Sequence, residues 1–103
     1  MDCKNLFHLP STPLDEEWID TLVDNPTLRI ERIISTGQTS SWYCQQEHEF
    51  VSLLQGEAEL EWEDGTKTHL VAGDTLTIPA HISHRVSYTS SQPPCVWLCI
   101  FWS

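Results

Sequence analysis

The segment Gly73 to Val86, which reads GDTLTIPAHISHRV, constrains the fold more than any other part of the chain. A glycine–aspartate turn leads into a short apolar strand that ends at Pro79. A tight corner then delivers His81 and His84 as the next strand begins. Histidine is the commonest metal ligand and a frequent general base. The segment therefore predicts a strand–corner–strand unit that holds two histidines at a fixed place.

The rest of the chain from Leu28 onward follows a period of two, which indicates β-strands. Residues 28–33 alternate between two faces, and residues 57–62 place acids on one face and apolar side chains on the other. Asp64-Gly65 is a strong hairpin signal. Seven or eight short strands separated by turn residues indicate an all-β sandwich or barrel, and double-sheet jelly rolls have this strand count.

The first 27 residues follow a different pattern. Asn5 to Pro10 predicts an edge strand that the prolines stop. Leu14 to Val23 carries apolar residues at helical spacing and acids early, where a helix dipole favours them, and Asn25-Pro26 would end it. We therefore expect a strand and one short helix in residues 1–27, packed on a barrel formed by residues 28–103 of the same domain.

Composition limits the classes of partner and the compartment. The net charge is −10 from fifteen acids and five bases, which argues against nucleic acid and anionic membranes. No window approaches the roughly 20 apolar residues of a membrane helix, and no signal peptide is evident. The four cysteines lack C-x-x-C spacing and are expected to be free thiols in a reducing compartment. We expect a cytoplasmic protein.

Two spacings resemble the signature motifs of the cupin superfamily. Gly73, Pro79 and His84 fit G-x5-P-x-G-x2-H, with His81 in place of the second glycine. Gly37, Glu49 and Gly56 fit G-x5-H-x-H-x3,4-E-x6-G, although Tyr43 and Gln45 replace both histidines. The string EFVSLLQG before the glycine and the string PAHISHRV look like small bacterial single-domain cupins of the RmlC-like type. The resemblance implies a double-stranded β-helix, the jelly-roll barrel.

The resemblance also implies a site. In cupins the two histidines, the glutamate and the second-motif histidine hold one divalent metal inside the barrel. Carried over by position, the metal ligands would be Tyr43, Gln45, Glu49 and His84, with Fe, Ni, Mn or Zn as the metal. The candidates for a catalytic proton shuttle are His81 and Tyr43. No organic cofactor is implied.

Several alternatives stay open at this point. With four residues before Glu49, the two histidine positions would instead fall on Trp42 and Cys44, and a thiolate would favour a soft metal. Glu49 could face solvent, and His84 could bond a backbone carbonyl. Tyr43 and Gln45 could satisfy one another in a polar network.

Two functional classes follow. The first is a cupin that binds a divalent metal and acts as an enzyme on a small molecule. The second is a metal-free cupin that serves as a small-molecule-binding, sensor or interaction module. Both expect a small ligand in the barrel, and an unpaired edge strand would favour a homodimer.

Overall fold

The structure, a computed structural model, describes residues 1–103 and contains eight antiparallel strands. The strands are β1 (Trp18–Asn25), β2 (Leu28–Ser35), β3 (His48–Gln55), β4 (Glu57–Trp62), β5 (Lys67–Val71), β6 (Thr75–Ile78), β7 (His84–Thr89) and β8 (Cys95–Trp102). They form a five-stranded sheet in the order β1-β2-β8-β3-β6 and a three-stranded sheet in the order β5-β4-β7. The predicted all-β fold is confirmed.

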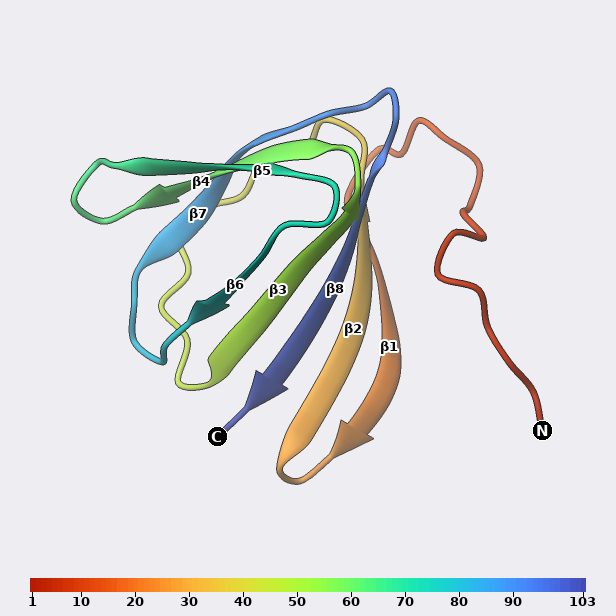
Figure 1. Ribbon diagram of the computed structural model, residues 1–103, viewed down its shortest axis with the longest axis horizontal. Helices are drawn as coiled ribbons and strands as arrows, with labels where there is room; N and C mark the ends of the chain where they lie inside the picture. Colours follow the sequence, from red (N-terminus) through yellow and green to blue (C-terminus); the bar gives the residue numbers. More distant parts are fainter.

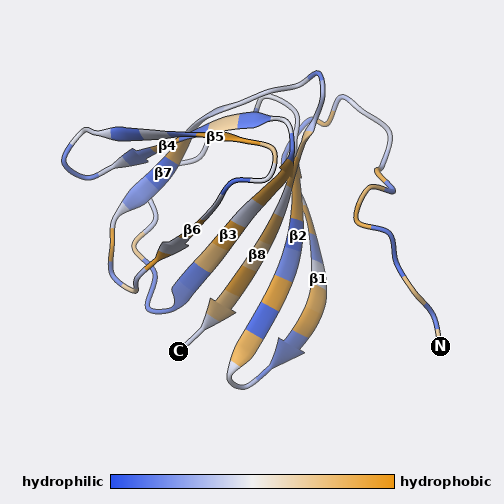
Figure 2. Ribbon diagram, viewed as in Figure 1, coloured by the Kyte–Doolittle hydropathy of each residue, from blue (hydrophilic) through white to orange (hydrophobic).

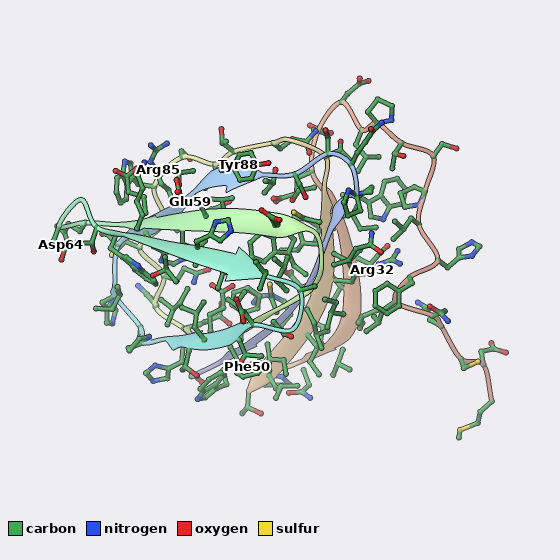
Figure 3. The ribbon with its side chains drawn as sticks, turned by 45° about the horizontal axis from the view of Figure 1, so that its top comes forward. Arg32, Phe50, Glu59, Asp64, Arg85 and Tyr88 are labelled. Atoms are coloured by element: carbon green, nitrogen blue, oxygen red, sulfur yellow. The ribbon has the colours of Figure 1, made fainter.

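The two sheets are separate layers: the smaller sheet lies at the upper left of Figure 1, and the strands of the larger sheet fan out below it and to the right. The chain passes from the larger to the smaller sheet at Gly56, between β3 and β4. It returns through residues 72–74 into β6. The predicted hairpin at Asp64-Gly65 joins β4 to β5, and Figure 3 places Asp64 at its tip.

Period-two alternation explains where the core lies. On β4, Ala58 and Leu60 are buried between the sheets. On the outer face of the same strand, Glu59 lies beside Tyr88 of β7 (Figure 3). β2 shows alternating polar and apolar bands in Figure 2. Leu53 is completely buried, and burial of such a side chain stabilises the fold by roughly 1.5–3 kcal/mol.

The predicted short helix over Leu14 to Val23 is wrong, because the structure contains no helix. Most of that segment is β1, which pairs with β2 and shifts register between Thr21 and Val23. The β-branched residues of β1 suit a strand. The side chain of Asn25 accepts hydrogen bonds from the backbone of Thr27 and Leu28, which closes a hairpin. Pairing with the open edge of β2 outweighs the propensity of a short helix.

The predicted edge strand over Asn5 to Pro10 is also wrong, because this segment is irregular. The guanidinium of Arg32 donates to the carbonyl oxygens of Leu6 and His8 at 3.1 and 2.7 Å and pairs with Asp20. Figure 3 shows Arg32 between the first strands and the N-terminal segment. The side chain of Arg32, and not a neighbouring strand, therefore bonds the backbone carbonyl groups of this segment.

The remaining sequence expectations concern membrane crossing and the state of the cysteines. No helix of the structure has the length and apolar character that a membrane crossing requires. All four cysteines are free; Cys3 and Cys44 are exposed, and Cys95 and Cys99 are buried.

Candidate functional site

Glu49 and His84 approach one another from opposite sheets. Glu49 is the second residue of β3 in the larger sheet, and His84 is the first residue of β7 in the smaller sheet. The Nε2 atom of His84 lies 3.8 Å from the Oε1 atom of Glu49. Only 8% of Glu49 and 4% of His84 is exposed. The two sheets thus bring an imidazole and a carboxylate together inside the barrel.

The corner before β7 fixes the orientation of the imidazole. Residue His81 takes a left-handed conformation, with a φ of 68°, and turns the chain back toward β7. The Nδ1 atom of His84 lies 2.9 Å from the carbonyl oxygen of Ile82. Because a carbonyl can only accept, Nδ1 carries the hydrogen. In the neutral ring, Nε2 therefore presents a lone pair toward Glu49.

The loop before β3 completes the polar wall. Tyr43 and His84 exchange backbone hydrogen bonds of 2.7 and 3.0 Å, and their rings lie 5.7 Å apart. The side-chain amide of Gln45 donates to Glu49 at 2.9 Å. The backbone oxygen of Gln45 also accepts from His81 at 2.7 Å, which ties this loop to the corner.

Burial sets the protonation of the acidic groups here. Burial raises the pKa of Glu49, and the hydrogen bond from Gln45 only partly opposes that shift. Burial, followed by the nearby Glu49, raises the pKa of the Cys99 thiol well above its usual value. Burial and the charge of Glu17 raise the pKa of Tyr43, so its phenol keeps its proton at neutral pH.

A cavity of about 190 Å³ opens beside Glu49 and His84. Ten of its sixteen lining residues are hydrophobic, which is typical of a small-molecule site. Its polar lining comes from both sheets and from the residues before β1 and β3. The six remaining residues are Glu17, Arg29, Glu31, Gln45, Glu49 and His84, and the phenol of Tyr43 adds a polar group to the hydrophobic set.

Arg29 is already engaged by carboxylates. Its Nε donates to Glu31 at 3.1 Å, and its two terminal nitrogens each donate to Glu47 at 3.0 Å. The guanidinium also stacks on Phe101, 4.3 Å from the ring centre. Glu17 also lines the cavity, and burial together with repulsion from Glu31 raises the pKa of Glu17.

The structure brings four of the predicted site residues to one cavity: Tyr43, Gln45, Glu49 and His84 all line it. His81 does not, because its side chain is exposed on the corner. The alternative register fails, because Trp42 and Cys44 are both exposed and outside the cavity. His48, the first residue of β3, lies outside the cavity and accepts a hydrogen bond from the backbone of Ala80. The chemical roles of these residues stay predictions.

Three charged residues of the cavity were not predicted from the sequence. Glu17 fell inside the expected helix, while Arg29 and Glu31 stand on one face of β2. The alternation of residues 28–33 already separated Arg29, Glu31 and Ile33 from their neighbours. The missing information was which of these two faces lies toward the barrel interior.

The donor set does not fit a resident divalent metal. No group of three or more His, Cys, Asp and Glu side chains is arranged to hold a metal ion, whereas a catalytic zinc site usually has three good protein ligands. Tyr43 keeps its proton, and Gln45 directs its amide nitrogen at Glu49. Only Glu49 and His84 remain as strong ligands.

Comparison with known proteins settles the family. The sequence model described as "Cupin domain" matches residues 31–101. The chain belongs to the cupin family. A protein from Ralstonia eutropha JMP134, provisionally named a mannose-6-phosphate isomerase, superposes with a TM-score of 0.93 and 35% identity over 99% of this chain and 98% of that chain. No protein with curated function matches the sequence.

More distant structures share the fold alone. A cupin superfamily protein from Desulfitobacterium hafniense DCB-2 has a TM-score of 0.79 and 21% identity, over 90% of this chain and 83% of that chain. The DMSP lyase DddQ from Ruegeria pomeroyi DSS-3 has a TM-score of 0.75 and 18% identity, over 93% of this chain and 51% of that chain.

Proposed function

We propose that this cupin binds one small organic molecule in the cavity beside Glu49 and His84, without a resident metal ion. The observation that carries the proposal is the convergence of these two buried side chains on a largely apolar cavity. Convergent polar groups in such a cavity orient a ligand, while the apolar wall contributes affinity.

The pair also suits proton transfer to or from a bound ligand. The Nε2 of neutral His84 can accept a proton, and burial raises the pKa of Glu49, which favours its role as a proton donor. The ring of Tyr43 lies 5.7 Å from that of His84, and its phenol is a candidate to pass a proton between His84 and the ligand. The name of the Ralstonia relative suggests isomerisation, which moves a proton between carbons, but it does not identify this chain's substrate.

Binding is tested by methyl NMR on protein kept in EDTA, with a panel of small alcohols, amines and carboxylic acids. The expected shifts fall on the cavity methyls of Val51, Ile78 and Val86. A Val86→Phe change would narrow the cavity and weaken binding, whereas Ile82→Phe, at an exposed residue outside the cavity, should leave it unchanged. Shifts confined to other surfaces, or no binding by any compound, would refute the proposal.

A metal-dependent enzyme is the second candidate, favoured by the retained Glu49 and His84 at 3.8 Å. It requires further donors beyond this pair, and the bound ligand would have to supply them. Under this alternative, EDTA would abolish ligand binding and one of Fe, Ni, Mn or Zn would restore it. Binding that persists in EDTA would eliminate this candidate.

A further inference from the structure

The cavity contains more carboxyl groups than cationic groups. Glu17, Glu31 and Glu49 line it, and Arg29 is its only lysine or arginine. That guanidinium already bonds Glu31 and Glu47. Three carboxylates therefore line the cavity, and its one guanidinium is shared between Glu31 and Glu47, in a chain whose net charge of −10 adds to the negative potential.

The two buried polar side chains of the cavity, His84 and Glu49, offer hydrogen-bond acceptors. The side chain of His84 is only 5% exposed, and its Nε2 makes no hydrogen bond within the protein. With Nδ1 bonded to the carbonyl of Ile82, that Nε2 is an acceptor in the neutral ring. Glu49 beside it accepts as well, and a ligand that satisfies both must bring N–H or O–H donors.

The rings of the cavity wall also suit a cation. Tyr43, Trp97 and Phe101 contribute aromatic rings to the lining. Arg29 already stacks on Phe101, so that ring face accommodates a positive group within the protein. Aromatic faces attract cations through the ring quadrupole, most strongly where water is excluded.

We propose that the ligand of this cavity carries a protonated nitrogen, as a small primary amine or ammonium compound does, and no phosphate. The ammonium group donates to Glu49 and to the Nε2 of His84, and Glu17 and Glu31 supply further negative charge at the same cavity. A phosphate dianion would face the same carboxylates without a free guanidinium. This inference rests on the proposed binding function and specifies its ligand class.

The test compares butylammonium, butanol and butyrate, which share one apolar chain and differ in charge, with mannose 6-phosphate as a fourth probe. Calorimetry and thermal shift at physiological ionic strength give the dissociation constants. We expect butylammonium to bind about tenfold more tightly than butanol, with butyrate and the sugar phosphate weaker still. Equal or tighter binding of butyrate or mannose 6-phosphate would overturn the ammonium proposal while leaving the binding function intact.

A matched pair of variants distinguishes the effect of a carboxylate in the cavity from the effect of the overall charge of the protein. Glu17 lines the cavity, whereas the neighbouring Glu16 is exposed and outside it. Glu17→Gln should reduce the preference for butylammonium over butanol by about three- to fivefold, and Glu16→Gln should leave it unchanged. An equal effect of both changes would refute the local origin of the preference. If none of the four probes bound, the binding function itself would fall.

Discussion

The corner at Gly56 offers a test of how the two sheets are held together. Gly56 follows β3, which carries Glu49, and precedes β4 of the opposite sheet. Its φ is 92°, and a Cβ atom there would lie 2.8 Å from the Oγ of Ser90 and 2.9 Å from the Sγ of Cys95. Both neighbours are fixed, because the Ser90 hydroxyl donates to Pro93 and the Cys95 thiol donates to Glu57.

The size of the effect of Gly56→Ala follows from two costs. A side chain in the left-handed region costs about 1–2 kcal/mol, and overpacking a tight site costs about 1–3 kcal/mol more. Gly65→Ala is the matched control, because Gly65 has a φ of 86° but a methyl group added there would meet no atom within 4 Å. Only Gly56→Ala should carry both costs.

Urea unfolding of the two variants measures the difference. Gly56→Ala should be less stable than Gly65→Ala by about 1–3 kcal/mol, and each 1 kcal/mol should lower the melting temperature by roughly 4–8 °C. The m-values should stay equal, because both native folds remain. Equal losses in the two variants would refute the argument from close contacts at this corner.

Three further predictions concern the interior and the N-terminal segment. Burial raises the pKa of Glu49, so the wild type should lose stability as the pH rises from the pKa of Glu49 in the unfolded state through its pKa in the folded state. Urea unfolding across that pH window should therefore show the Glu49→Gln variant gaining stability relative to the wild type. A difference in stability that does not change with pH would contradict this prediction. Arg32→Ala should expose the backbone at residues 6–8 to faster hydrogen exchange and lower stability by about 1–3 kcal/mol, whereas unchanged exchange would count against the contact. A thiol reagent should modify two of the four cysteines in the native protein, with Cys95 and Cys99 reacting only in denaturant; their rapid native reaction would show that the core is more open.

The sequence alone predicted the barrel and the presence of Glu49 and His84 inside it. Alternation from Leu28 onward indicates strands because one face of each strand packs in the core, and the Gly73 to His84 spacing identified the cupin corner. The second spacing, from Gly37 through Glu49 to Gly56, and the resemblance to cupins placed Tyr43, Gln45, Glu49 and His84 together inside the barrel, and all four line one cavity. These features depend on local turns and on the period of the chain, which a single sequence records.

The errors arose where long-range pairing decides the structure. Residues 14–23 fit a helical period, but the open edge of β2 pairs with most of them as β1. The helical interpretation placed Glu17 outside the barrel. It also left β1 out of the sheet, so the sequence did not show which face of β2, the one with Arg29 and Glu31 or the other, lies toward the interior. The acidic character of the cavity was therefore not predictable from the motifs alone.

The metal content of the purified protein tests the central claim most directly. The protein is prepared without chelator or affinity metal, incubated in turn with Fe(II), Ni(II), Mn(II) and Zn(II), desalted, and measured by plasma mass spectrometry. The donor set of Glu49 and His84 alone predicts clearly substoichiometric metal in every case. Near-stoichiometric binding of any one metal, lost in a Glu49→Gln, His84→Gln double variant that remains folded, would contradict a metal-free cupin.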